Sequence, residues 1–248
     1  MTLEQFFAEN REVAVAFSGG VDSAYLLYAA TRYAARVKAY YVSTAFQPEF
    51  ELADARRLAD ELGADMLVLH VDVLSNSAVT ANPSDRCYHC KNTLFRQILR
   101  AAENDGFPVL LDGTNASDDA GDRPGMRALR ELSVRSPLRE CGLTKAEIRR
   151  LSKEAGLFTW DKPAYACLAT RIRTGEEITL QKLKQTEKAE GFLFGLGFRD
   201  FRVRMVGNTA KLELREADLP LLLENREKVV TELHKDYDSV LLNLEVRK

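Results

Sequence analysis

A glycine-rich turn between an apolar run and a helical pattern constrains this chain more than any other feature. Residues 13–17 (VAVAF) are apolar and β-rich, and they lead directly into residues 18–23 (SGGVDS). Without side chains, the two glycines let the backbone adopt positive φ and bring several N–H groups, with the positive end of the next helix, close to one phosphate group. The serines add hydroxyl donors, and Asp22 is suited to hold magnesium. The sequence therefore predicts a phosphate-binding loop.

The spacing of this loop separates it from two other nucleotide-binding loops. A Walker A loop needs a lysine followed by Ser or Thr, a dinucleotide fingerprint needs three glycines, and neither pattern is present. The loop resembles the PP-loop of the ATP pyrophosphatase superfamily, whose members hold the β,γ-pyrophosphate in this turn. The resemblance implies binding of ATP and transfer of AMP. The alternative is a tight strand-to-helix turn with two incidental glycines.

Length and charge narrow the functional class. The chain has 248 residues, enough for one large domain or two modest ones. A net charge of -2 gives no general attraction for nucleic acid, although a local basic patch remains open. No apolar stretch is long enough to span a membrane, and the N-terminus does not resemble a signal peptide. We therefore expect a cytoplasmic protein with a small-molecule substrate and no nucleic-acid or membrane partner.

Apolar runs alternate with helical patterns over the first two thirds of the chain. The predicted strands cover 13–17, 37–42, 66–71 and 109–111, and the predicted helices cover about 23–33, 50–62, 91–102 and 144–155. This alternation predicts an α/β fold with a doubly wound, Rossmann-like parallel sheet. Ligands in such sheets bind at the carboxyl ends of the strands. The glycine turn and the turn Asp112-Gly113-Thr114-Asn115 are therefore expected to face one pocket.

The last third of the chain has a different pattern. Residues 157–175 show no periodicity, and such a long loop is more often functional than idle. A predicted helix over 179–196 is followed by strands over 201–206 and 210–214, a helix over 219–234 and a strand over 240–246. This order predicts a small C-terminal α+β domain. We place the domains at 1–175 and 176–248, with the boundary near Gly175.

Cys87 and Cys90 form a C-x-x-C pair, expected on a loop that leads into a helix. A thioredoxin-type redox pair would follow the first strand of its own fold, and a structural zinc site would need a second pair nearby. Cys141 and Cys167 are not spaced as such a pair. An iron–sulfur site with a remote third cysteine and a pair of buried thiols both remain open.

Cys167 is followed by Arg171 and Arg173. Positive neighbours lower the pKa of a thiol and favour the nucleophilic thiolate, so a reactive cysteine and a core cysteine are both open readings. Cys141 comes just before a helix cap and is expected to be structural.

Two charged clusters remain. Residues 118–125 concentrate aspartates and Arg123 after a turn, which suits magnesium or a phosphorylated substrate, but also a solvated loop. Arg202 and Arg204 lie two apart on a predicted strand and therefore share a face, where they could clamp an anion or form an exposed pair.

These motifs together resemble the LarE-type ATP-dependent sulfur transferases, which mature a nickel-pincer nucleotide cofactor. The resemblance runs from about residue 13 to residue 214. It rests on the PP-loop and on the strings DRCYHCK (85–91), DGTN (112–115), DRPG (122–125), WDKP (160–163), ACLATR (166–171) and RVR (202–204).

The resemblance implies that a carboxylate of a pyridinium biscarboxylic acid mononucleotide is adenylylated, and that sulfur then replaces AMP to give a thiocarboxylate. One form of the family sacrifices the sulfur of the cysteine matching Cys167. Another form holds a four-iron four-sulfur cluster on three cysteines, which match Cys87, Cys90 and Cys167. We therefore expect such a cluster, with the three sulfur atoms close to the α-phosphorus of ATP.

The family's functional residues carry over by position. Residues expected to contact ATP and its magnesium are Ser18, Gly19, Gly20, Asp22, Ser23, Ser43, Gly113, Thr170 and Arg171. Those expected on the substrate side are Arg123, Glu190, Arg202 and Arg204. The resemblance also implies a homo-oligomer.

Three other functions remain open at this point: a PP-loop tRNA thiolase, a nucleotide-binding regulator without chemistry, and an ammonia-using synthetase. The last of these would not need the cysteines.

Overall fold

The computed structural model describes residues 1–118 and 124–247. The chain forms two compact units: unit 1 contains Met1–Val73 and Asp85–Ala164, and unit 2 contains Leu74–Ser84 and Tyr165–Lys248. The division after Ala164 lies earlier than the boundary expected near Gly175. The domain limits 1–175 and 176–248 stay a prediction.

Hydrogen bonds with Asn82 explain why the irregular stretch before Gly175 belongs to unit 2. Asn82 is buried at a φ of 52°, and its Nδ2 donates to the carbonyls of Ile172 at 3.3 Å and Arg173 at 2.8 Å. The Gly175 amide donates to the carbonyl of Asn82 at 2.8 Å. These partners are about 90 residues apart, so no local pattern reveals them.

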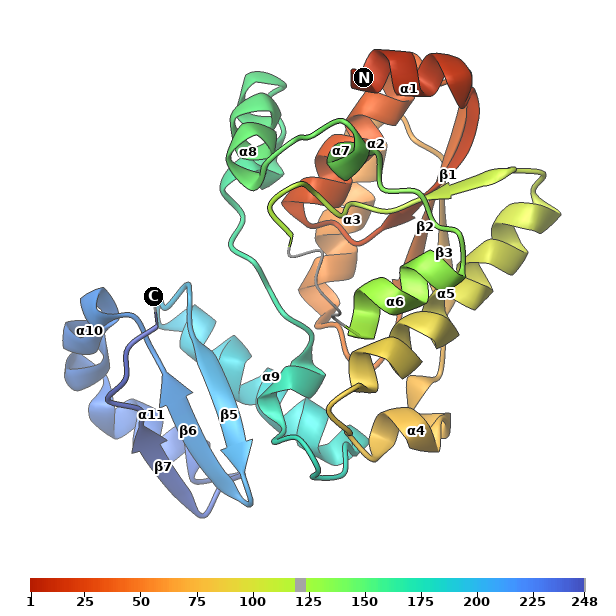
Figure 1. The fold of residues 1–248 in the computed structure, drawn as a ribbon. Helices are drawn as coiled ribbons and strands as arrows, with labels where there is room; N and C mark the ends of the chain where they lie inside the picture. The colour runs from red at the N-terminus through yellow and green to blue at the C-terminus, as the bar shows by residue number, and fades with distance from the viewer. Residues whose placement is uncertain (119–123, 248) are drawn as a thin grey trace. The chain divides into compact units, whose positions relative to one another are not determined.

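Unit 1 is built on a parallel sheet with the strand order β3-β2-β1-β4 (Figure 1). Its strands are β1 (Glu12–Phe17), β2 (Arg36–Ser43), β3 (Met66–His70) and β4 (Val109–Leu111). Val13, Ala14 and Val15 are fully buried, as expected for a strand covered on both faces. The predicted doubly wound sheet is confirmed.

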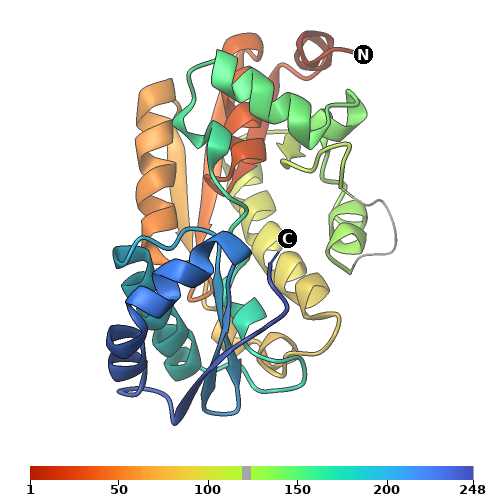
Figure 2. The ribbon, with the colours of Figure 1, turned by 90° about the vertical axis from the view of Figure 1, so that its left-hand side faces the viewer.

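Helices cover both faces of this sheet. They are α1 (Leu3–Glu9), α2 (Val21–Tyr33), α3 (Glu49–Leu62), α5 (Arg86–Asn104), α6 (Pro124–Glu131), α7 (Pro137–Glu140) and α8 (Lys145–Glu154). Val13 and Val15 pack with α2 and α3, while Ala14 packs with Ile98 of α5 on the opposite face. Figure 2 shows α3 and α5 on either side of the strands. The helices α1, α6 and α7 were not predicted from the sequence.

Unit 2 is a small α+β unit, as predicted. Its sheet has the order β5-β6-β7, with β5 antiparallel and β7 parallel to β6. Its elements are α4 (Ser77–Thr80), α9 (Leu180–Gly195), β5 (Arg202–Val206), β6 (Thr209–Glu213), α10 (Leu219–Glu224), α11 (Arg226–Leu233) and β7 (Ser239–Leu242). Leu193, Phe198 and Phe201 anchor its core.

Two boundaries in unit 2 differ from the prediction. The single helix predicted over 219–234 is two helices that meet at Asn225, whose Nδ2 turns back to the carbonyl of Leu221 at 3.0 Å. The last strand ends at Leu242 instead of continuing to residue 246, and Leu244 beyond it is 87% exposed.

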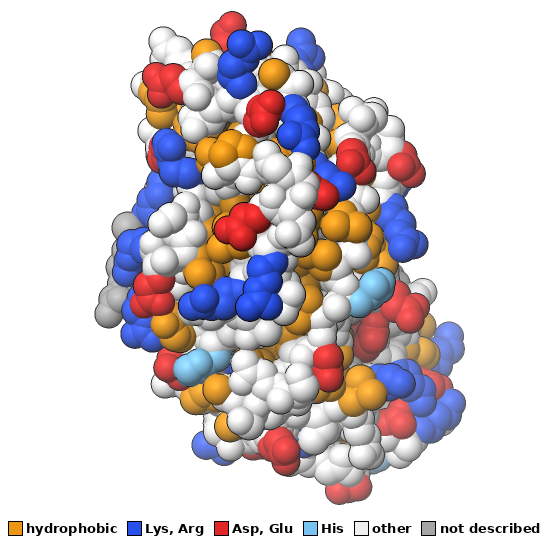
Figure 3. Space-filling view, turned by 90° about the vertical axis from the view of Figure 1, so that its right-hand side faces the viewer, with side chains coloured by type: hydrophobic (Ala, Val, Ile, Leu, Met, Phe, Trp, Pro, Cys, Tyr) orange, Lys and Arg blue, Asp and Glu red, His pale blue; other side chains and the backbone are white. Residues whose placement is uncertain are grey.

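No helix within residues 1–118 and 124–247 is long and apolar enough to cross a membrane. Acidic and basic side chains are interspersed on the face shown in Figure 3, and hydrophobic side chains are exposed between them. This mixture fits the near-neutral net charge of the chain.

Candidate functional site

The glycine turn is a preformed loop between β1 and α2. The Ser18 amide donates to Ser23 Oγ at 3.2 Å, and Ser23 Oγ donates to the Gly20 carbonyl at 3.1 Å. Gly19 has a φ of 71°, and a Cβ added to it would lie 3.3 Å from the Cβ of Ala55. The loop therefore depends on a missing side chain at Gly19 and is held by its own serines.

The loop lies where the order of the sheet reverses. β2 pairs with one side of β1 and β4 with the other, and a crevice at such a switch point is the usual ligand site of an open α/β sheet. The turn after β4 touches the loop, because a Cβ added to Gly113 would lie only 2.9 Å from the Ser23 amide nitrogen. The expected proximity of the two turns is confirmed, and their sharing of one ATP pocket stays a prediction.

Ser43, the other predicted ATP contact in unit 1, ends β2. Because β2 is parallel to β1, Ser43 lies at the same edge of the sheet as the glycine turn. Its side chain is half-buried, and its carbonyl accepts from the Val71 amide at 3.0 Å.

Lys145 is a charged neighbour of the loop that the sequence analysis missed. Its Nζ lies 2.5 Å from Asp22 Oδ2. Burial raises the pKa of Asp22, and the ion pair with Lys145 opposes that rise. Lys145 is the first residue of α8, where a cation opposes the helix dipole. This unfavourable placement is the one sign in the sequence that Lys145 has a partner outside its own helix.

Asp22 also carries an oxygen suited to a divalent cation. Asp22 Oδ1 is buried and has no hydrogen-bond partner among the residues that the structure describes. A buried carboxylate oxygen without a partner is costly, and Mg²⁺ prefers carboxylate ligands. The side chain therefore fits the magnesium that the family implies.

Lys162 approaches the loop from the other side. Its Nζ lies 2.7 Å from Asp54 Oδ2 and 3.4 Å from the Gly19 carbonyl oxygen, and its side chain is 14% exposed. Arg149 fixes this segment by donating to the carbonyls of Trp160 at 2.6 Å and Lys162 at 2.8 Å. Two lysines thus flank the loop, each paired with an aspartate.

Cys87 and Cys90 lie in the first turn of α5, so the expectation of a preceding loop was wrong. The Tyr88 amide already donates to the carbonyl of Asp85 at 2.8 Å, and α5 begins at Arg86. Cys87 is exposed and Cys90 half-buried, and residues three apart share a helix face. The Arg86 side chain lies 3.9 Å from Cys87 Sγ. The pair is therefore placed to supply two thiolate ligands near a positive charge.

Cys167 lies in unit 2 and is half-buried at the start of the 3₁₀ helix η3 (Leu168–Arg171). The Thr170 amide and hydroxyl both donate to the Cys167 carbonyl, at 2.9 and 2.8 Å. The fully buried Arg171 donates from Nη1 to the carbonyls of Ala166 at 2.6 Å and Cys167 at 3.4 Å. The backbone around Cys167 is therefore held by Arg171.

Arg171 is in turn fixed by Glu190 of α9. Its Nε and Nη2 donate to the two carboxylate oxygens of Glu190 at 2.8 and 2.9 Å, and both side chains are buried. Burial by itself lowers the pKa of Arg171, but the hydrogen bonds that it donates to Glu190 and the attraction of that carboxylate together outweigh burial, and the pKa of Arg171 is raised. Glu190 also accepts from the Tyr165 hydroxyl and from the Val203 amide at 2.9 Å. Direct contact of Arg171 with phosphate, and of Glu190 with substrate, stays a prediction.

Arg202 and Arg204 share one face of β5. Arg202 is 6% exposed, and its pKa is lowered by burial and then by repulsion from Arg171 and Arg247. Arg204 pairs with Glu213 at 3.0 Å and donates to the Thr170 carbonyl. Arg202 also lies 3.9 Å from Asp200, so its burial among charges of both signs does not fit an exposed pair of charges.

The remaining predicted residues are Arg123, the acidic cluster around it and Cys141. Arg123 and Asp119 to Asp122 of the acidic cluster lie outside the described residues. Cys141 packs against the main core of unit 1, and burial raises the pKa of its thiol, as suits a structural residue. Within the described ranges, no three His, Cys, Asp or Glu side chains gather into a metal site.

Known proteins resemble this chain over most of its length. The asparagine synthase family matches residues 4–119. A pyridinium-3,5-bisthiocarboxylic acid mononucleotide synthase of Lactiplantibacillus plantarum is 34% identical over 87% of this chain and 79% of its own length. An uncharacterized protein of Synechocystis sp. is 39% identical over 86% of this chain and 80% of its own.

A more distant relative lies in another branch. A tRNA-specific 2-thiouridylase of Thermotoga petrophila is 27% identical over 59% of this chain and 52% of its own length. The similarity over most of both chains and the PP-loop geometry agree with each other. The chain is an ATP-dependent sulfurtransferase, and it belongs to the LarE-type family within the PP-loop ATP pyrophosphatase superfamily.

Proposed function

We propose that this protein converts pyridinium-3,5-biscarboxylic acid mononucleotide to a thiocarboxylate in the biosynthesis of the nickel-pincer nucleotide cofactor. The observation that carries this proposal is the similarity to the Lactiplantibacillus plantarum synthase over most of both chains. The preformed loop at residues 18–23 and the fixed segment around Cys167 support this proposal.

The first step is adenylylation. A carboxylate oxygen of the substrate attacks the α-phosphorus of ATP, the bond from that phosphorus to the bridging oxygen breaks, and pyrophosphate leaves. Backbone N–H groups of Gly19 and Gly20, with the start of α2, stabilise the departing charge. Asp22 would hold the magnesium ion, which would neutralise phosphate charge. Ser18, Ser23, Ser43 and Gly113 complete the proposed ATP contacts.

Lys145 and Lys162 have a definable role in this step. Their charges are balanced by Asp22 and Asp54. We propose that both ammonium groups turn toward the phosphates of ATP, because each lies within a few ångströms of the loop. Lysine suits this task as a compact cation on a flexible stem.

The second step delivers sulfur. A sulfur nucleophile attacks the acyl carbon, the bond from that carbon to the AMP oxygen breaks, and AMP leaves with the electron pair. A cluster on Cys87, Cys90 and Cys167 would supply sulfide. In the sacrificial alternative, Cys167 Sγ forms a thioester, and loss of the Cα proton with cleavage of the Cβ–S bond leaves dehydroalanine and the thiocarboxylate. Arg171 positions the Cys167 backbone for either route.

Several finer expectations belong to the same proposal. Thr170 and Arg171 are proposed near the phosphates, and Arg123, Glu190, Arg202 and Arg204 on the substrate side. Convergence of the three sulfur atoms, a homo-oligomeric assembly and a cytoplasmic location stay predictions.

Two measurements test the proposal. Protein purified without oxygen is incubated with ATP and the biscarboxylic mononucleotide, and pyrophosphate and thiocarboxylate are quantified. Cys167→Ser should keep pyrophosphate release and lose sulfur transfer, whereas Cys141→Ser should keep both. Absence of pyrophosphate release from the wild-type protein would contradict the reaction. Iron and labile sulfide near four per chain support the cluster, and a colourless protein with one zinc refutes it.

A tRNA thiolase is the second candidate, since the Thermotoga petrophila enzyme shares part of the sequence. A gel-shift assay with bulk tRNA at moderate salt separates the two functions. We expect no shift.

A further inference from the structure

A cationic pocket in unit 2 lies where η3 meets β5 and β6. It has a volume of 250 Å³, and the charged residues that line it are Arg171, Arg173, Arg204, Lys211 and Glu213. Pockets that hold whole small molecules are usually about 300–1,000 Å³, so this one is sized for one group of a larger ligand.

The charges in this pocket do not balance. Arg171 is paired with the buried Glu190, and Arg204 is paired with Glu213 at 3.0 Å. In the part of the chain that the structure covers, neither Arg173 nor Lys211 forms an ion pair with an acidic side chain. The pocket therefore keeps two uncompensated positive charges.

The backbone positions these two cations. Lys211 lies directly opposite Arg204 in the antiparallel ladder of β5 and β6. The Arg173 carbonyl accepts from the buried Asn82 at 2.8 Å, and the preceding Ile172 bridges to Met205 of β5. Thr174 adds a hydroxyl to the lining. Strand pairing and a buried amide therefore fix the backbone that carries both cations, while the Arg173 side chain itself is exposed.

We propose that Arg173 and Lys211 form a subsite for the phosphate monoester of the nucleotide substrate. A phosphate monoester carries a charge of about -1.5 to -2 at pH 7, which matches the two free cations. A single carboxylate would leave one of them unbalanced. This inference rests on the proposed function, because it assigns one group of that substrate.

The test compares the biscarboxylic mononucleotide with its dephosphorylated nucleoside in ATP-dependent pyrophosphate release. Arg173→Ala and Lys211→Ala should each raise the KM for the mononucleotide about ten-fold, since each removes one charge-assisted contact. The KM for ATP should not change. The double variant should lose the preference of the wild-type protein for the mononucleotide over the nucleoside, and Lys211→Arg should largely keep it.

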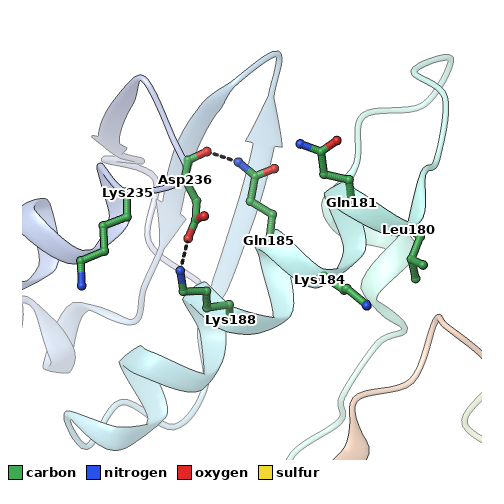
Figure 4. A pocket seen from close by; sticks show the side chains of 7 residues that line it. All are labelled: Leu180, Gln181, Lys184, Gln185, Lys188, Lys235 and Asp236. Carbon is green, nitrogen blue, oxygen red and sulfur yellow. Dashed lines mark hydrogen bonds and ion pairs between the residues drawn. The ribbon is translucent and has the colours of Figure 1, made fainter.

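Lys184 provides a matched control. It is a lysine on α9 that lines a separate, open pocket of 590 Å³ containing none of the predicted site residues. Figure 4 shows Lys184 beside Gln181 and Gln185, with Lys188 paired to Asp236 at 2.6 Å. Lys184→Ala removes one positive charge from unit 2 and should leave all constants unchanged.

The outcomes separate this inference from the proposed function. Unchanged KM values in both single variants, with normal pyrophosphate release, would overturn the subsite and leave the function intact. A rise in the KM for ATP instead would assign these cations to ATP and also overturn the subsite. If the wild-type protein releases no pyrophosphate, calorimetry with the mononucleotide and the nucleoside decides. If the double variant no longer binds the mononucleotide more tightly than the nucleoside, the subsite is supported. If the double variant keeps the same preference for the mononucleotide as the wild-type protein, the subsite is refuted.

Discussion

The glycine turn of unit 1 and the Cys167 segment of unit 2 are both irregular, but they are held in different ways. The turn is fixed by its own backbone and two serines, and its charged neighbours Lys145 and Lys162 are only partly buried. The Cys167 segment is fixed by a fully buried guanidinium with a carboxylate partner from α9. The ion pairs of the first region are partly exposed, whereas the ion pair of the second region is buried.

The buried pair should give the largest change in stability. Glu190→Ala leaves Arg171 charged and buried, and we expect the free energy of unfolding to fall by about 3–5 kcal/mol. Urea denaturation followed by circular dichroism measures it, with Glu190→Gln as the milder variant if the alanine variant does not fold. Glu154→Ala breaks the exposed pair with Arg150 and should cost less than about 1 kcal/mol. Equal effects at the two sites would contradict a structural role of the buried pair.

The contact between the two turns of unit 1 is the next test. In Gly113→Ala, the new Cβ would meet the Ser23 amide at 2.9 Å, so the loop must shift. We expect pyrophosphate release to fall about 100-fold, because a displacement near 1 Å is that costly in an organised site. Gly191→Ala in α9 meets no atom within 4 Å and serves as the control. Full activity of Gly113→Ala would show that the loop tolerates movement.

Substitutions of Lys162 and of its partner Asp54 should have a smaller effect, and the KM for ATP should not change in the same direction in the two variants. Lys162→Met should raise the KM for ATP about ten-fold, because a cation near the phosphates is lost. Asp54→Asn frees the same lysine and should leave the KM unchanged or lower it. Steady-state pyrophosphate release at varied ATP measures both. A rise in both variants would mean that the ion pair itself, rather than the free lysine, supports the loop.

The smallest effect concerns a partly exposed pair next to the turn after β4. Arg135 lowers the pKa of Glu140 below its ordinary value of 4.5, and the Arg135 carbonyl accepts from the Asp112 amide. Because the pKa of Glu140 is lower in the folded state, its carboxylate stabilises the fold at a pH above the pKa of the unfolded state. This contribution is lost as the pH falls through the pKa of the folded state. Glu140→Gln should therefore cost about 1 kcal/mol or less at neutral pH and nothing in acid, as thermal melts between pH 3 and pH 7 will measure. A constant difference across this range would refute the electrostatic origin.

The local sequence pattern was sufficient to predict the parts of the fold that depend on residues close together in the sequence. The strand, glycine turn and helix at residues 13–33 follow from apolar periodicity and two glycines. The touching turn at Gly113 follows from the rule that parallel strands end at one edge.

Contacts between distant residues were not accessible in the same way. The pairing of Lys145 with Asp22 spans more than 120 residues, and that of Arg171 with Glu190 joins a loop to a helix face. The early start of α5 depends on backbone bonds at Asp85, and no side-chain cap marks it. These features arise from packing, for which a charged residue at an unfavourable helix position was the only local sign.

Leu74–Ser84 belongs to unit 2 although the residues on both sides of it belong to unit 1, and this limits where the gene can be divided. The polypeptide passes between the units three times, after Val73, after Ser84 and after Ala164. Neither unit is thus encoded by one uninterrupted stretch, and a fragment ending at Ala164 would carry an eleven-residue segment in which Thr80 and Asn82 lack their hydrogen-bonding partners from residues 172–178. Recombination between relatives will preserve both halves only when the short insert is exchanged together with the C-terminal segment.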